Sequence, residues 1–167
     1  MKTPAETNID QIELLKKLLA DSNENNANAI AYAAWAAALT TGSELVVKLV
    51  EETIGSLSES AMRDVKFAVA RMGVTNPYFM ARQFFPLPAG GTLAALNFRT
   101  FAEIKVNNAL AYHHACVAIS LINGGFMCLK DHASQLKNAG VSDSDIDATM
   151  RIAAAAHSLN LISKLPR

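Results

Sequence analysis

The residues best suited to chemistry in this chain are Cys128 and His132. Cys128 closely follows Gly124-Gly125, so a helix that starts there holds the thiol in its first turn. Unpaired backbone N–H groups and the positive end of the helix dipole favour a thiolate at that place. His132 lies four residues on, on the same helix face, where an imidazole can accept the thiol proton. The spacing predicts a Cys–His nucleophile; the alternative is a small buried thiol with an unrelated histidine nearby.

A second group of candidates precedes this pair. Two interpretations fit the adjacent histidines His113 and His114. Functionally, one of them relays protons beside Cys128; structurally, one ring is packed in the core and the other is exposed to solvent. The intervals among histidines and cysteines match no zinc spacing, so neither a metal nor another cofactor is predicted. Cys116 lies eight residues before Gly124 and Cys128 four residues after it. That offset, about 6 Å along packed helices, argues against an intrachain disulfide.

The elements that must position these residues are helices throughout. Apolar periodicity and caps predict early helices over about 9–19, 28–41, 44–54 and 58–72, the last closed by Gly73. Helical texture resumes near Leu93 and continues to the C-terminus, with breaks at 123–125 and 138–140. The last long helix is expected from about 143 to 162. The predicted fold class is all-α.

The stretch from Val74 to Gly91 differs from these helices because it is rich in proline, glycine and aromatic residues. It predicts an irregular connector with one short helix at most. Its aromatic side chains either pack beneath it as a satellite core or form an apolar wall or lid over the reactive site.

A weak internal repeat organises the chain. Ala29-Ile30-Ala31-Tyr32 is echoed by Ala109-Leu110-Ala111-Tyr112 at an offset of eighty residues, and the glycine breaks and serine caps that follow keep the same order. We interpret residues 1–167 as one domain with two related helical halves, about 28–73 and 108–162.

Composition excludes several classes of function. Fifteen basic and fifteen acidic side chains give a formal charge of zero, which argues against nucleic acid or an anionic membrane as partner. The first residues lack the apolar run of a signal peptide, and two cysteines are too few for a secreted disulfide scaffold. We therefore expect a soluble cytoplasmic protein. Its apolar fraction of 51% favours a homo-oligomer.

The segment Ile119-Ser120-Leu121-Ile122-Asn123-Gly124-Gly125-Phe126-Met127-Cys128-Leu129-Lys130-Asp131-His132 resembles the active-site motif I-N-G-C-x-x-C-x-x-x-H of the alkyl hydroperoxidase D and carboxymuconolactone decarboxylase superfamily. The resemblance continues through Leu136, Asn138-Ala139-Gly140-Val141 and the alanine-rich segment that follows. Asn76-Pro77-Tyr78-Phe79 is similar to the family's mid-chain N-x-x-Y/F stretch. The resemblance implies a duplicated, all-helical domain.

Members with the complete motif use both cysteines as a redox dithiol that reduces a peroxiredoxin or a hydroperoxide, and a glutamate and the motif histidine relay protons. By this resemblance, Cys128 matches the peroxide-facing cysteine and His132 the motif histidine. Gly125 stands where the first cysteine belongs, and His113 stands where the relay glutamate would be. The usual dithiol cycle therefore lacks its resolving thiol.

The leading hypothesis is a hydroperoxidase-type antioxidant enzyme that reduces a hydroperoxide or another small-molecule substrate through Cys128, with His132 and His113 moving protons. An external thiol reductant or a peroxiredoxin would be its partner, and the resemblance favours a trimer or hexamer. One alternative is a cofactor-free lyase, similar to carboxymuconolactone decarboxylase, that uses His113 or His132 as acid and base, with Arg82 or Arg99 holding an anion. Another is a non-catalytic oligomeric scaffold with a relic site.

Overall fold

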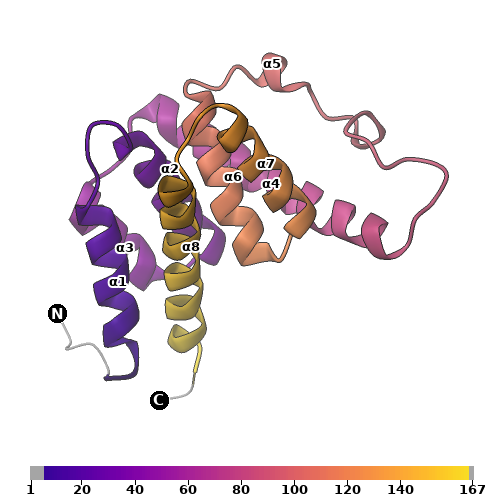
Figure 1. Ribbon diagram of the computed structural model, residues 1–167. Coiled ribbons are helices and arrows are strands. Elements are labelled where there is room, and N and C mark those ends of the chain that lie inside the picture. The colour runs from indigo at the N-terminus through magenta and orange to yellow at the C-terminus, as the bar shows by residue number, and fades with distance from the viewer. Residues whose placement is uncertain (1–5, 166–167) are drawn as a thin grey trace.

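Helices make up the regular structure of this chain (Figure 1). The computed structural model describes residues 6–165, and no strand occurs among them. The elements in chain order are η1 Glu6–Asn8, α1 Ile9–Ala20, α2 Ala27–Thr41, α3 Glu44–Ile54, α4 Glu59–Phe84, η2 Ala94–Leu96, α5 Phe101–Ile104, α6 Ala109–Asn123, α7 Phe126–Asn138 and α8 Asp143–Ser163. The all-α prediction is confirmed. Residues 1–5, at the start of the predicted polar tail, lie outside the described residues.

The centre of the bundle is the packing of α2 against α6, with α4 and α8 flanking both helices. Five fully buried alanines of α2 lie at this centre: Ala33, Ala34, Ala36, Ala37 and Ala38. Small side chains let helix axes approach closely, so the alanine content of the sequence becomes tight interhelical packing. Larger side chains, among them Trp35 and the two tyrosines of the repeat, fill the remaining core.

The two predicted halves contain the same order of elements. α2 ends at Gly42 and α6 at Gly124, both with left-handed backbone at φ +63° and +69°. The serines Ser58 and Ser142 cap α4 and α8 by accepting hydrogen bonds from backbone N–H groups three residues on. Each half thus has a long helix, a glycine break, a shorter helix and a serine-capped helix, while duplication as its origin stays a prediction.

The prediction that Gly73 closes a helix is wrong, because α4 continues through Gly73 and Pro77 to Phe84. Pro77 has no N–H to donate to the Gly73 carbonyl four residues earlier, and its ring crowds that carbonyl, so local preference opposes a helix here. Thr75 donates its hydroxyl to the Arg71 carbonyl at 3.1 Å, and Asn76 is anchored to α6 by side-chain hydrogen bonds. Tertiary contacts therefore hold this stretch helical despite its local signals.

The irregular connector lies later than predicted, over residues 85–108, interrupted by η2 and α5. In Figure 1 the end of α4 and this connector project from the bundle before the chain returns through α5. Phe84, Phe85 and Leu87 are exposed, with 80% exposure for Phe84, so the satellite core predicted for these residues is wrong. No described helix is both long and apolar enough to cross a lipid bilayer.

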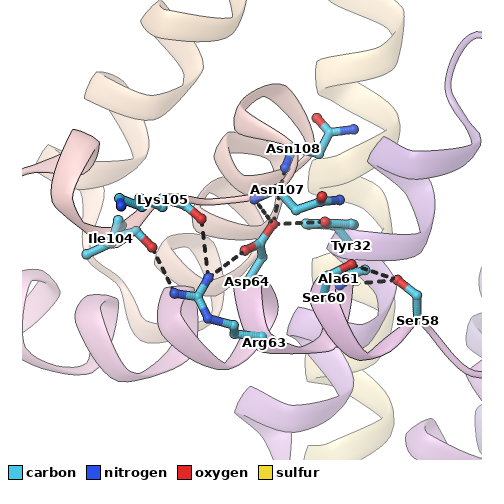
Figure 2. A network of polar contacts seen from close by, with 10 residues as sticks. All are labelled: Tyr32, Ser58, Ser60, Ala61, Arg63, Asp64, Ile104, Lys105, Asn107 and Asn108. Atoms are coloured by element: carbon cyan, nitrogen blue, oxygen red, sulfur yellow. Dashed lines mark hydrogen bonds and ion pairs between the residues drawn. The ribbon is translucent and has the colours of Figure 1, made fainter.

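A buried carboxylate fixes the start of α6, the helix that carries the candidate histidines (Figure 2). Asp64 accepts hydrogen bonds from the Tyr32 hydroxyl at 3.0 Å and from the backbone N–H groups of Asn107 and Asn108 at 2.8 and 3.2 Å. Arg63 lies 3.6 Å from the same carboxylate. Burial and the Asp64 carboxylate raise the pKa of Tyr32 to about 12. This network ties α2, α4 and α6 together one turn below His113.

Candidate active site

Cys128 lies in the first turn of α7, as predicted. α6 ends at the left-handed Gly124, and Gly125 is the N-cap of α7. The Gly125 N–H donates to the Ser120 carbonyl at 2.8 Å, which fixes the sharp reversal between the two helices. The Cys128 side chain is 8% exposed, and it lies on the wall of a cavity of about 720 Å³. A cavity of this size is within the range of small-molecule sites.

One face each of α4, α6 and α7, together with two connector residues, lines the cavity. The lining residues are Arg71, Met72, Thr75, Phe79, Arg82, Gln83, Leu93, Phe101, Tyr112, His113, Met127, Cys128, Asp131, His132 and Gln135. The structure therefore brings Cys128, His132 and His113 to one cavity. Phe79, an aromatic residue of the predicted connector stretch, forms part of its wall, in line with the second interpretation of that stretch. Of the two arginines proposed as anion holders, Arg82 lines the cavity and Arg99 does not.

The imidazoles of His113 and His132 contact one another, with their Nδ1 atoms 2.9 Å apart. One Nδ1–H must donate and the other Nδ1 must accept. A neutral ring that donates from Nδ1 has a bare Nε2, whereas a neutral ring that accepts at Nδ1 carries its proton on Nε2. The pair therefore presents one Nε2 base and one Nε2–H acid.

Both rings are neutral near pH 7. Burial, followed by the neighbouring His113 and Arg71, lowers the pKa of His132 to about 4. Burial also lowers the pKa of His113, against a smaller opposing effect of Asp131. A neutral pair can take up a proton on one ring and release one from the other, so the geometry suits proton transfer near neutrality.

The connector positions the His113 ring. Phe101 of α5 stacks on His113 with ring centroids 5.6 Å apart and an interplanar angle of 12°. The same phenyl ring contacts Tyr112 edge-on at 5.5 Å. The Tyr112 hydroxyl is buried and has no hydrogen-bond partner among the described residues. Sequence analysis missed Tyr112 as a lining residue, although it directly precedes His113.

His114 and Cys116 belong to the core rather than to the cavity. The His114 Nδ1 lies 2.7 Å from the Thr149 hydroxyl, and burial lowers the pKa of this imidazole to about 4. Cys116 is fully buried, and burial raises the pKa of its thiol. Both cysteines are free thiols. Of the adjacent histidines, His114 is packed, whereas His113 is half-buried at the cavity.

Comparison with known proteins places these residues in a family. The family model described as "Carboxymuconolactone decarboxylase family" matches residues 111–164, a range that includes His113, Cys128 and His132. Proteins named alkyl hydroperoxide reductase AhpD are similar over a longer range. The chain is 31% identical to that of Hyphomonas neptunium over 124 residues, which cover 73% of this chain and 68% of the relative. It is 30% identical to that of Streptomyces coelicolor over 128 residues, covering 75% and 71%. The chain belongs to the alkyl hydroperoxidase D-like, carboxymuconolactone decarboxylase superfamily.

The AhpD of Caulobacter vibrioides is 35% identical to this chain over 109 residues, 61% of the chain. That match covers 56% of the relative's length. The fold and the cavity are thus those of a superfamily member, while the activity of this chain has to be argued from its own site.

One departure from the superfamily motif has a steric reason. At Gly125, where the motif places its first cysteine, an added Cβ would lie 2.5 Å from the Asn76 Cβ and closer still to Asn76 Cγ and Nδ2. Asn76 is 1% exposed; it donates to Ser120 Oγ at 2.9 Å and accepts from Asn123 at 3.1 Å. The Asn76 side chain therefore fills the space that a side chain at position 125 would need.

Two charged residues of the site, besides Tyr112, were not predicted from the sequence. Arg71 and Asp131 line the cavity beside the histidine pair. Asp131 had a signal, since it directly precedes His132 in the quoted motif. Arg71 had none, because only the continuation of α4 past Gly73 shows which face of that helix borders the cavity.

Proposed function

We propose that this protein is a one-cysteine hydroperoxidase that reduces organic hydroperoxides. The observation that carries the proposal is the position of Cys128, in the first turn of α7 and on one cavity with the 2.9 Å His113–His132 pair. Backbone N–H groups of a first turn stabilise negative charge on sulfur, and the histidine pair supplies both a base and an acid. The mostly apolar wall, with Phe79, Leu93 and Phe101, favours alkyl over hydrogen peroxide.

The oxidation step follows from these groups. A bare Nε2 of the histidine pair accepts the Cys128 thiol proton, and the thiolate attacks one oxygen of ROOH. The S–O bond forms as the O–O bond breaks, which leaves Cys128 as sulfenic acid and releases RO⁻. The Nε2–H of the other ring protonates RO⁻ to ROH. Sulfur is oxidised by two electrons and the peroxide is reduced by two.

The reduction step requires thiols from outside the chain. Asn76 occupies the place of a resolving thiol at position 125, and Cys116 is fully buried. An external thiol R′SH converts the Cys128 sulfenic acid to a mixed disulfide and water. A second thiol then releases R′SSR′ and restores Cys128. A small dithiol or a partner peroxiredoxin is the class of reductant that fits this cycle.

Trapping of sulfenic acid tests the proposal directly. Wild type, Cys128→Ser and Cys116→Ala are treated with substoichiometric cumene hydroperoxide and then with dimedone, and adducts are measured by intact mass spectrometry. We expect one adduct on wild type and on Cys116→Ala and none on Cys128→Ser. His132→Gln should slow adduct formation by about 100-fold, as for a lost general acid or base. Absence of any adduct in wild type would reject the hydroperoxidase.

A lyase acting on a small carboxylated lactone is the second candidate, and the guanidinium groups of Arg71 and Arg82 on the cavity favour it. In that case the histidine pair would serve as acid and base, and activity would survive Cys128→Ser but not His132→Gln. A non-catalytic scaffold with a relic site predicts no turnover in wild type, so neither variant changes it. Wild type, Cys128→Ser and His132→Gln therefore distinguish the alternatives.

We also propose that the chain forms a homo-oligomer, a trimer or hexamer. Phe84, Phe85 and Leu87, at and just after the projecting end of α4, are exposed. Large exposed apolar side chains in one region indicate association. Light scattering coupled to gel filtration measures the mass; Phe84→Glu with Phe85→Glu should reduce it to that of one chain.

A further inference from the structure

Two arginines on the cavity-lining face of α4 have no carboxylate partner. Arg71 and Arg82 take part in none of the ion pairs formed by the described residues. Asp131 is the one carboxylate on the cavity wall, so the formal charge of the lining is positive with both histidines neutral. A positive lining within apolar walls attracts an anion, because the low local dielectric strengthens the interaction.

Both guanidinium groups are held in place and have donors left for a ligand. Arg71 donates one N–H to the Arg99 carbonyl at 2.9 Å and lies 5.0 Å from the Phe98 ring centroid. Arg82 donates one N–H to the Leu87 carbonyl at 2.5 Å. A guanidinium has five N–H groups, so each arginine can still bind a carboxylate with two of them.

The two arginines mark opposite ends of the α4 lining. They are eleven residues apart, about 16 Å along the helix axis, and Thr75 and Phe79 lie between them. Arg71 belongs to the catalytic end, since its charge contributes to the lowered pKa of His132. Tyr112, whose buried hydroxyl has no hydrogen-bond partner among the described residues, is also a lining residue. Arg82 lies in the last turn of α4, at the end of the helix that projects from the bundle (Figure 1).

We propose that the cavity binds amphipathic carboxylates, with the carboxylate on Arg82 and the apolar chain along Phe79 toward Cys128. If the protein is the hydroperoxidase proposed above, its preferred substrates are hydroperoxides of long-chain carboxylic acids. The peroxide group then meets Cys128 and the histidine pair, while the acid group stays at the outer end. Neutral alkyl hydroperoxides of the same length lack the second contact and bind more weakly.

Binding of a ligand that cannot react separates this inference from the peroxidase activity. Dodecanoate and methyl dodecanoate are titrated calorimetrically into wild type and Cys128→Ser. Both proteins should bind the acid about tenfold or more tightly than the ester, because a charge-assisted pair is lost with the ester. Arg82→Gln should abolish this preference and Arg82→Lys should keep most of it. Arg99→Gln, a change outside the cavity lining, should leave it unaltered.

Equal affinity for acid and ester in wild type, or a preference that survives Arg82→Gln, would overturn the inference. If Arg82→Gln does not fold, the preference of wild type is measured against salt, since a carboxylate–guanidinium contact weakens on screening and an apolar contact does not. If sulfenic acid trapping fails while the acid preference and its loss in Arg82→Gln hold, the binding site stands and the hydroperoxidase falls.

Discussion

The two halves of the molecule treat matching positions differently. In α2 the compared positions of the repeat are occupied by Tyr32, Ala33 and Ala34. The Tyr32 hydroxyl donates a hydrogen bond to the buried Asp64 (Figure 2). In α6 the matching positions are His113, His114 and Tyr112, and the Tyr112 hydroxyl has no partner among the described residues. The first half thus uses Tyr32 in a structural hydrogen-bond network, whereas the second places His113 on a cavity and packs His114 in the core.

The comparison indicates how one helical plan serves two purposes. The Asp64 network rigidifies the bundle, because the Tyr32 hydroxyl and the backbone N–H groups of Asn107 and Asn108 all find an acceptor in one oxygen of this carboxylate. An open set of groups destabilises slightly and can bind a ligand. We therefore expect stability to depend mainly on the polar groups of the first half and function on those of the second.

Removal of the buried carboxylate should produce the largest effect. Asp64→Ala leaves Tyr32 and two backbone N–H groups unpaired and should lower the free energy of unfolding by about 3–5 kcal/mol. Urea unfolding followed by circular dichroism measures it. A loss below about 1 kcal/mol would contradict the structural role given to the first half.

Acid should weaken the second half through His114. The folded pKa of about 4 lies below the ordinary value of 6.5, so the unfolded chain binds the proton first as pH falls. Stability is complete above pH 6.5 and should decrease by about 3 kcal/mol by pH 4 from this ring alone. His114→Gln should flatten the decrease in unfolding free energy between these pH values. Thr149→Val is the matched control and should keep the slope, because burial causes the shift.

A side chain at Gly125 should cost stability without restoring a dithiol. Gly125→Cys and Gly125→Ala should each lower the unfolding free energy by about 1–3 kcal/mol, since both Cβ atoms overlap Asn76. In the first half the matching position is Ser43, a buried residue that carries a side chain. Asn76→Gly combined with Gly125→Ala should recover part of the loss in urea melts, whereas strictly additive losses would remove Asn76 as the cause.

The smallest effects on the free energy of unfolding are expected from changes at the two tyrosines, Tyr32 and Tyr112. Tyr32→Phe should cost about 1–1.5 kcal/mol, because Asp64 loses a hydrogen bond. Tyr112→Phe should be neutral within about 0.5 kcal/mol, because its hydroxyl has no partner to lose. Thermal melts of both variants decide the point; equal losses would remove the asymmetry between the halves.

Sequence patterns predicted the fold well wherever local signals and packing agree. The caps at Ser58 and Ser142 and the break at Gly124 are local, and each occurs where expected. The continuation of α4 could not be predicted, because Asn76 is held by Ser120 and Asn123, residues more than forty positions away in the chain. Propensity at Gly73 and Pro77 was overridden by these tertiary contacts.

The candidate site was predicted in part for the same reason. Cys128 and His132 share one helix, so their spacing predicted a common face. The contact between His113 and His132 depends on the reversal at Gly124, which places α7 beside α6. Arg71 gave no sign in the sequence that it borders a cavity, because lining depends on how three helices and the connector meet.

The Nδ1–Nδ1 contact of His113 and His132 has one more consequence for the proposed cycle. When a proton enters at one Nε2 and another leaves from the other Nε2, both tautomers are reversed. The next proton can then be accepted only by the Nε2 that released one. Oxidation of Cys128 moves one proton from thiol to alkoxide, and its reduction must carry one back toward the sulfenic oxygen that leaves as water. The oxidation and the formation of the mixed disulfide then return the pair to its starting tautomers, while the second thiol brings the proton that Cys128 regains.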